Sequence, residues 1–295
     1  MAVTEAPPVE KLITGTRPGR ALAGRFVAGD TLDDAVAVAK RLNDDGFLVS
    51  LDLLGEEVHD RPSALAAVDE YLECLDRIEQ EGIDANISVK PTQLGLAIDE
   101  SLAMDAIDRL GEQARSASTT VTIDMEDSRY TEATVRLFEK GQPSHGNLGI
   151  AIQAYLRRSP ADLERLIPLG GHVRLCKGAY VEPAEIAFTS EHEIDEAFTR
   201  LLRRLLAATP TMPAVATHDG ALIDLTRELA ATRTEPFEFQ MLYGVRPELQ
   251  RRLINEGFPL RIYLPFGSQW YPYLTRRLAE RPANLGFFAR ALLGR

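Results

Sequence analysis

The stretch from Leu260 to Glu280 reads LRIYLPFGSQWYPYLTRRLAE and holds one strand, one turn and one helix. Its apolar start, residues 260–264, predicts a buried strand, Gly267 predicts a turn, and a helix is expected to begin near Gln269. Similar apolar runs recur along the whole chain, with amphipathic stretches between them. Such alternation of strand and helix is typical of an α/β fold with a parallel sheet.

Eight short runs rich in β-branched residues predict strands, namely 47–51, 86–89, 120–123, 148–152, 172–175, 214–217, 237–241 and 260–264. Helices are expected between them, at 63–80, 98–116, 161–168, 193–207, 222–231 and 247–256. Eight such units close into a TIM-like (β/α)8 barrel, which commonly reaches this length as one domain. A doubly wound open sheet is the alternative, although no Gly-x-Gly-x-x-Gly fingerprint follows any of the runs.

The expected domain organisation is a lead-in of residues 1–30 followed by a single barrel domain of residues 31–295. Proline and glycine are frequent in the lead-in, which favours loose order. Thr31 is placed to cap a first helix, because Thr-Leu-Asp-Asp puts acidic residues at its positive end. This helix forms an N-terminal helical extension to the barrel.

The composition limits the classes of partner and compartment. The 295 residues carry a formal net charge of −11, which argues against nucleic acid as a partner because phosphate binding needs clustered positive charge. The two cysteines, Cys74 and Cys176, are too few for a disulfide framework and suit the reducing cytoplasm. No apolar run of membrane-spanning length and no signal-peptide pattern is apparent.

Arg276 and Arg277 form an adjacent pair on the last predicted helix. Isolated pairs of this kind are usually solvated, but helical spacing puts Tyr273 and Glu280 on the same face. Two guanidinium groups repel unless an anion lies beside them, and carboxylate is the small anion that they match in bidentate fashion. A small acid is therefore the expected ligand.

Polar residues occur at or near the carboxyl end of most predicted strands, where active sites lie in this fold. They are Lys90, Asp124, Glu126, Asp127, Gln153, Arg174, Lys177, Thr217, His218, Asp219, Gln240 and Tyr263. Lysines in such places form Schiff bases or hold an anion electrostatically, and the acids with His218 are weak candidates for a divalent metal site. Gly178, after a basic strand end, lets backbone approach a phosphate or a flat ring.

Four motifs taken together resemble those of the proline dehydrogenase family: VRLCKGAY at 173–180, ATHD at 216–219, FQMLYG at 239–244, and Tyr-x-x-Arg-Arg-x-x-Glu at 273–280. The resemblance extends from Lys90 to Glu280 and looks like the stand-alone bacterial enzyme. It implies a flavoenzyme on a distorted (β/α)8 barrel that binds FAD without a Rossmann fingerprint. It also implies oxidation of L-proline to Δ1-pyrroline-5-carboxylate, by hydride transfer from C5 to flavin N5.

The resemblance assigns roles to individual residues. For the substrate, it implies that Arg276, Arg277 and Lys90 hold the proline carboxylate and that Asp124, Leu242 and Tyr263 complete the pocket. On the cofactor side, Arg174 lies near N5, Gln153 hydrogen-bonds the ring system, Cys176, Gly178 and Tyr180 line it, and Thr217, His218 and Asp219 serve the ribityl-phosphate and adenine side. Glu280 is counted with the cofactor residues and orients Arg276 or Arg277. Two positions depart from the family pattern: Asp219 where asparagine is frequent, and Glu191 where a lysine is often offered to the phosphates.

The implied partners are a quinone that accepts the electrons and a pyrroline-5-carboxylate dehydrogenase that receives the product. Transfer to a quinone implies that this protein, which the cysteine count places in the cytoplasm, makes peripheral contact at the inner face of the cell membrane. Two other functions are compatible with the same barrel. One is a Schiff-base or metal-assisted lyase that acts on a small carboxylic acid, and the other is a barrel that binds an amino acid without turnover.

Overall fold

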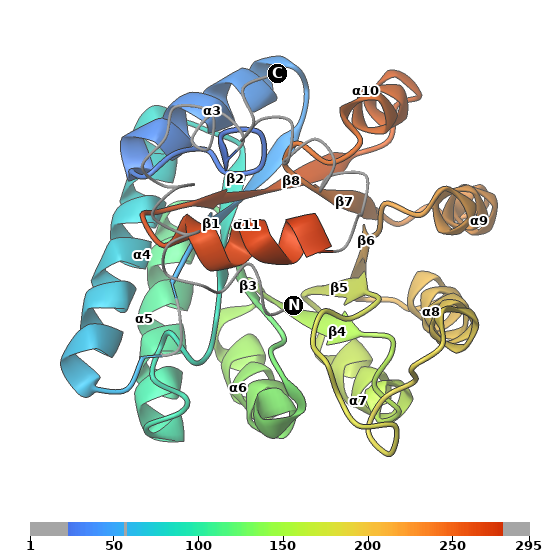
Figure 1. Ribbon diagram of the computed structural model, residues 1–295, viewed down its shortest axis with the longest axis horizontal. Helices are drawn as coiled ribbons and strands as arrows, with labels where there is room; N and C mark the ends of the chain where they lie inside the picture. The colour runs from blue at the N-terminus through green and yellow to red at the C-terminus, as the bar shows by residue number, and fades with distance from the viewer. Residues whose placement is uncertain (1–22, 56–57, 280–295) are drawn as a thin grey trace.

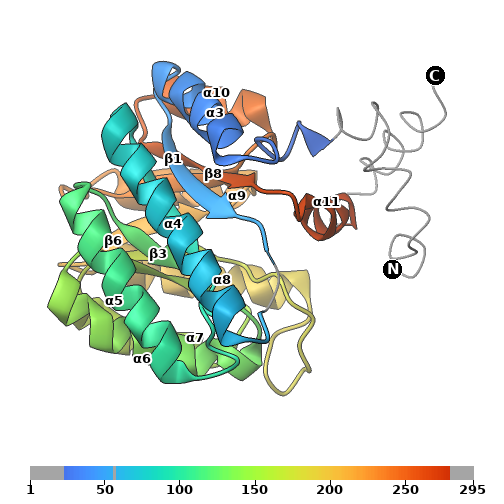
Figure 2. The same ribbon diagram turned by 90° about the vertical axis from the view of Figure 1, so that its left-hand side faces the viewer.

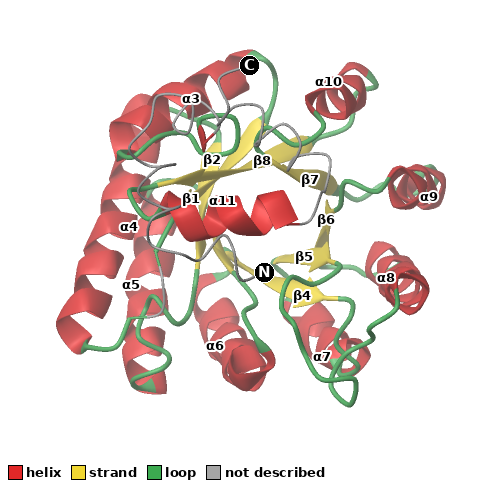
Figure 3. Ribbon diagram, viewed as in Figure 1, coloured by secondary structure: helices red, strands yellow, loops and turns green. Residues whose placement is uncertain are grey.

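The computed structural model describes residues 23–55 and 58–279, and its central feature is a closed barrel of parallel strands (Figures 1 and 3). The strands are β1 (Leu48–Leu53), β2 (Ala85–Val89), β3 (Val121–Ile123), β4 (Leu148–Gln153), β5 (His172–Cys176), β6 (Met212–Ala216), β7 (Glu238–Leu242) and β8 (Leu260–Phe266). Each strand pairs with its neighbour in sequence, and β8 returns to pair with β1. The predicted barrel is confirmed and the open sheet is wrong.

A ring of helices surrounds the barrel (Figure 1). It comprises α3 (Leu32–Asp44), α4 (Arg61–Glu81), α5 (Glu100–Ser116), α6 (Ser128–His145), α7 (Ser159–Leu166) with the short 3-10 turn Ile167–Leu169, α8 (Glu191–Leu206), α9 (Gly220–Ala230) and α10 (Pro247–Asn255). Thr31 caps α3 in a capping box with Asp34, as the sequence predicts. Helix α6 is absent from the predicted helices, because Gly141 and Pro143 near its end are residues that ordinarily interrupt a helix.

The last helix, α11 (Trp270–Ala279), follows β8 but does not join the ring. It lies across the barrel opening, and α3 packs against β1 and β8 in the ring instead (Figures 1 and 2). A separate apolar cluster holds α11 to residues 23–27, with Trp270 and Leu274 packed against Phe26 and Val27. Because residues 276 and 277 belong to α11, their backbone lies over the barrel mouth.

The hydrophobic core lies outside the sheet rather than inside the barrel. Alternate strand residues such as Val49, Leu51 and Ile87 are fully buried against the helices. The residues between them point into the lumen, and residues paired in register share that face. Most of these lumen residues are polar or small, and they include Ser50, Asp52, Ser88, Thr122, Gly149, Arg174, Ala214, Glu238, Gln240, Arg261 and Tyr263. Since branched apolar residues usually fill this space, a polar lumen marks the interior as functional.

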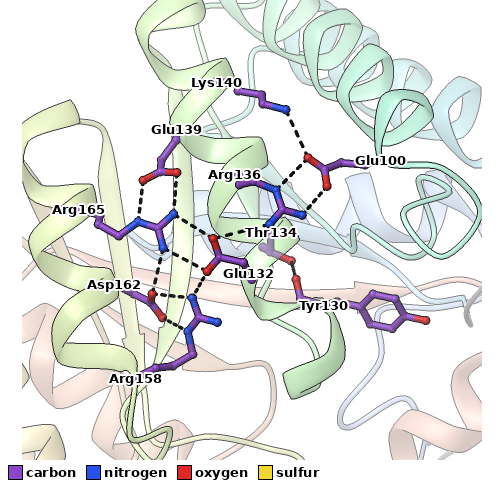
Figure 4. Close-up of polar contacts among 10 residues, drawn as sticks. All are labelled: Glu100, Tyr130, Glu132, Thr134, Arg136, Glu139, Lys140, Arg158, Asp162 and Arg165. Atoms are coloured by element: carbon purple, nitrogen blue, oxygen red, sulfur yellow. Dashed lines mark hydrogen bonds and ion pairs between the residues drawn. The ribbon is translucent and has the colours of Figure 1, made fainter.

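Ion pairs join three helices of the ring on the outside of the barrel (Figure 4). Glu132 on α6 accepts from both Arg158 and Arg165, and Arg165 also pairs with Glu139 at 2.8 Å. Arg136 connects the same helix to Glu100 on α5 at 2.5 Å. The network fastens α5, α6 and α7 to one another. None of the helices in the described ranges combines the length and the apolar character that a membrane crossing needs.

Candidate active site

Asp124, directly after β3, organises the mouth of the barrel. Its Oδ1 accepts from the Nη1 of Arg174 and, at 2.8 Å, from the hydroxyl of Ser88. Its Oδ2 accepts from the hydroxyl of Tyr263 at 2.7 Å. The guanidinium carbon of Arg174 also lies 5.1 Å from the centroid of the Tyr263 ring. The carboxylate therefore fixes a cation and an aromatic ring side by side at the strand ends.

Tyr263 is a hydrogen-bond donor at this site. Burial raises the pKa of its hydroxyl well above 10, and the charges of Asp124 and Asp52 raise it further. The phenol therefore stays protonated over the neutral range and cannot serve as a base there.

Lys90, after β2, forms an ion pair with Asp52 on β1. Asp52 is only 1% exposed and Lys90 is 18% exposed. Burial lowers the pKa of the Lys90 ammonium, but the charges of Asp52 and Asp124 outweigh this effect and raise it overall. A Schiff base needs a neutral amine, so the structure favours the electrostatic role for this lysine.

Lys177 is also held as a cation, by two acids beyond β5. Its Nζ lies 3.0 Å from Asp219 and 2.5 Å from Asp195 on α8. Burial lowers its pKa, but the hydrogen bonds and charges of the two aspartates raise it overall. Glu191, the other unusual acid, is exposed in the first turn of α8.

The candidate ring-side residues lie on β4, β5 and the loop after β5. The amide nitrogen of Gln153 donates to the carbonyl of Glu126 at 2.7 Å, and its oxygen accepts from the backbone of Ala179 at 3.2 Å. Burial raises the pKa of the Cys176 thiol to about 12, so the sulfur stays protonated. Gly178 has φ +134°, and a Cβ there would meet the Tyr155 ring at 2.3 Å. The aromatic ring that the backbone of Gly178 approaches in this structure is therefore that of Tyr155. The side chain of Tyr180 is exposed.

The ATHD segment forms the loop between β6 and α9, because β6 ends at Ala216 rather than at the predicted Thr217. The Thr217 hydroxyl accepts from the backbone of Asp219 at 3.1 Å, and Asp219 caps α9. Nε2 of His218 accepts from the backbone nitrogen of Leu242 at 3.0 Å, which ties this loop to the end of β7. Leu242 is thereby placed at the mouth beside β8.

Arg276 and Arg277 belong to α11, but the described side chains end at Thr275. Glu280 lies outside the described residues. Tyr273, expected on the polar face of this helix, is 7% exposed and packs in the apolar cluster with Leu274. The structure thus brings Lys90, Asp124, Arg174 and Tyr263 together and carries the arginine pair on the helix that covers them (Figure 1).

The predicted metal candidates are not assembled. Glu126 accepts from the backbone and hydroxyl of Thr92 at 2.8 and 2.6 Å, and Asp127 caps α6. Both were expected to end strand three, but β3 stops at Ile123 and leaves them in the following loop and cap. In the described part of the chain, no group of three or more histidines, cysteines and acids could hold a metal ion.

Sequence reasoning missed Asp52, the partner of Lys90, and left Gln240 out of the candidate site. Asp52 stands in the run LVSLDL, and an acid inside an apolar strand is a signal that could have found it. The predicted strand ended at Leu51, two residues before the end of β1 at Leu53.

Comparison with known proteins identifies the family of this chain. Residues 35–290 match the family model described as Proline dehydrogenase. Proline dehydrogenase 1 of Bacillus subtilis (strain 168) is 40% identical over 283 residues, which cover 95% of this chain and 92% of that protein. Proline dehydrogenase of Deinococcus radiodurans is 34% identical over 301 residues, covering 99% and 96%.

A solved structure, proline utilization A (PutA) from Bdellovibrio bacteriovorus inactivated by N-propargylglycine, superposes with a TM-score of 0.83 at 25% identity. The match covers 89% of this chain and 33% of that one. None of these relatives supports the lyase alternative, and the cationic state of Lys90 and Lys177 disfavours its Schiff-base form. The chain belongs to the proline dehydrogenase family and is an oxidoreductase.

Proposed function

We propose that the chain oxidises L-proline to Δ1-pyrroline-5-carboxylate with FAD as its cofactor. The observation that carries the proposal is the cluster of Arg174, Asp124 and Tyr263 at the barrel mouth, under a helix that bears two adjacent arginines. A cyclic amino acid offers a carboxylate for the cations and an apolar ring for Tyr263. The relatives from Bacillus subtilis and Deinococcus radiodurans are named for this substrate.

The residues present fit a flavin ring. Nη2 of Arg174 makes a single hydrogen bond within the described residues, to Ser50 at 3.5 Å, so it retains capacity to donate to a ring nitrogen or oxygen. Gln153 and the backbone around Gly178 would border the ring. Lys177 would meet the diphosphate, and the nearby Asp219 and Asp195 are unfavourable for that anion. The site therefore fits the ring better than the diphosphate.

The chain's own residues would act mainly by positioning. Arg276, Arg277 and Lys90 would hold the carboxylate, with Lys90 itself fixed by Asp52. Tyr263, held by Asp124, and Leu242 would confine the proline ring. When bound, FAD supplies the hydride acceptor, its N5, for the hydrogen on C5 of proline. Because Lys90 is cationic and Tyr263 stays protonated, neither offers a base for the proline amine, which would bind neutral.

The wider context is also proposed. Electrons would pass to a quinone, with peripheral membrane contact in the cytoplasm, and the product would pass to a pyrroline-5-carboxylate dehydrogenase. Residues 31–295 would form one catalytic domain, which the family match over residues 35–290 supports.

The test is the visible absorption spectrum of the purified protein, recorded without oxygen before and after L-proline is added. Flavin bands that bleach with L-proline support both cofactor and reaction. Flavin bands that do not respond would overturn proline as the substrate and direct the search to other cyclic or N-alkyl amino acids. Absence of flavin, even after incubation with FAD, would overturn the proposal.

A further inference from the structure

A second buried ion pair lies below Arg174, toward the floor of the barrel. Nε and Nη2 of Arg261 donate to the two carboxylate oxygens of Glu238, at 2.8 and 3.1 Å. Nη1 of Arg261 donates to the backbone of Val49 at 2.8 Å, which anchors the pair to β1. Glu238 is 4% exposed. Neither residue can reach a ligand at the mouth directly.

Gln240 connects this pair to Arg174. It follows Glu238 by two residues on β7, so both side chains face the lumen. Its Nε2 donates to Oε1 of Glu238 at 2.6 Å, and its Oε1 accepts from Nε of Arg174. An amide can bind in either of two orientations, and the carboxylate selects the one whose oxygen faces the arginine.

The neighbouring strand leaves room for this connection. In the barrel register Ala214 on β6 pairs with both Arg174 and Glu238, and Ala216 pairs with Gln240. These two methyl groups are all that β6 offers to the lumen at this level. The side chain of Arg174 can therefore cross β6 and meet Gln240 on β7.

Glu238 acts on Gln240 as a charged group. Burial raises the pKa of its carboxyl, but the charge and hydrogen bonds of Arg261, with the hydrogen bond of Gln240, lower it overall. Its neighbour His172 offers no proton at neutral pH, since burial lowers the imidazole pKa to about 4. A carboxylate that is ionised at neutral pH gives the amide one orientation.

We propose that Glu238, held by Arg261, is a positioning residue that sets the guanidinium of Arg174 through the side chain of Gln240. The guanidinium of Arg174 is then held at two points, through Nη1 by Asp124 at the mouth and through Nε by Gln240, which Glu238 orients from the floor of the barrel. The effect on catalysis rests on the proposed function, because it requires Arg174 to serve the reaction. The effect on the position of the Arg174 side chain does not depend on the proposed function.

The test is a double-mutant cycle with Glu238→Gln, Gln240→Leu and both changes together. Glu238→Gln keeps the size and one acceptor oxygen, replaces the other oxygen with an NH2 donor, and removes the charge. The first readout is the 15N–1H signal of the Arg174 Nε, assigned by its loss in Arg174→Lys and recorded without substrate. We expect Glu238→Gln to shift and broaden this signal in the native background and to leave it unmoved in the Gln240→Leu background. Equal shifts in both backgrounds, or none in either, would overturn the proposal.

The second readout is kcat/KM for L-proline. Misplacing a guanidinium at the reacting centre is expected to lower it by about ten-fold or more in Glu238→Gln, but by less than about two-fold when Gln240→Leu is already present. The two readouts can disagree. If the Arg174 signal shows the coupling but neither the native protein nor any variant oxidises L-proline, the proposed function is refuted and the positioning role of Glu238 stands.

Two controls separate positioning from stability. Asp162→Asn removes a carboxylate of similar burial from the ion pairs of α7 (Figure 4), and it should lower the unfolding temperature without moving the Arg174 signal. Glu238→Gln with Arg261→Met removes both charges of the buried pair, which folding tolerates better than the loss of one. That variant should shift the Arg174 signal as Glu238→Gln does, and a native signal in it would contradict the inference.

Discussion

The hydroxyl of Tyr263 lies 2.7 Å from Oδ2 of Asp124, while the other oxygen of the same carboxylate accepts from Arg174. One acid therefore holds both the residue proposed to cover the substrate and the residue proposed to face the cofactor. A change at either side chain is expected to disturb the other through Asp124.

Tyr263→Phe removes the donor to Asp124 and keeps the ring. A hydrogen bond to a charged group contributes about 1.5–3 kcal/mol, so kcat/KM for L-proline should fall about 10- to 100-fold with the fold intact. Steady-state kinetics and circular dichroism check this. The matched control is Tyr71→Phe, since Tyr71 is buried and donates to Gln93 at 2.9 Å; it should lose stability and keep its activity. An unchanged kcat/KM in Tyr263→Phe would contradict the proposed role.

Asp52→Asn leaves the Lys90 cation without its buried partner. Breaking such a pair costs about 3–5 kcal/mol, whereas removing both charges is often close to neutral. The double variant Asp52→Asn/Lys90→Met should therefore be more stable than Asp52→Asn in urea unfolding. It should nevertheless show a raised KM for L-proline, because it lacks a cation for the carboxylate. A double variant less stable than the single one would mean that Lys90 is stabilised by groups other than Asp52.

His172 makes the protein less stable in mild acid. The folded-state pKa of about 4 lies below the ordinary 6.5, so between these values the unfolded chain binds a proton that the folded chain does not. Stability is thus fully present above pH 6.5 and is lost as the pH falls toward 4, by about 2 kcal/mol at pH 5. His172→Gln, which can still bond to Thr122, should lose less stability between pH 7 and pH 5 in urea titrations. Parallel losses in both proteins would show that the folded imidazole takes up the proton.

Gly244, in the loop after β7, has φ +71°, and a Cβ there would lie 1.6 Å from the carbonyl oxygen of Arg25. Gly244→Ala should destabilise the protein by about 2–5 kcal/mol, through left-handed strain and the clash with backbone. Gly82→Ala is the control, because Gly82 has φ +60° with nothing near its Cβ position. It should cost only about 1–2 kcal/mol. Equal costs in thermal unfolding would mean that the segment at Arg25 moves aside.

The barrel could be predicted from the sequence because each strand carries its own apolar, β-branched signal. The strand ends were less predictable. Thr217 was assigned to strand six because threonine is common in strands, and Asp52 was left outside strand one because an acid near a strand end is typical of a loop. Helix α6 was not predicted because Gly141 and Pro143 counter the helix signal. Tertiary packing against β4 outweighs that local preference.

The candidate site was predictable where polar residues lie at or near strand ends, as with Lys90 and Asp124. Tyr263 was also found, although β8 continues beyond it to Phe266. Its connections were not, because the hydrogen bonds from Arg174 to Gln240 and from Tyr263 to Asp124 join residues 66 and 139 positions apart. The position of α11 could not be predicted from its own sequence either, because an equally amphipathic helix could lie in the outer ring of helices. The packing of Trp270 and Leu274 with Phe26 and Val27 distinguishes the two places.

The separation between a polar lumen and an apolar outer face of the sheet has a consequence for engineering this chain. Successive residues of one strand face different environments. Val49 packs against the helices and can be changed to improve packing, whereas Ser50 contacts Arg174 in the lumen and should be kept. Libraries aimed at thermostability should sample the residues that face the helices, and libraries aimed at substrate scope should sample the residues that face the lumen. The two sets interleave along every strand, and the register of the barrel tells them apart.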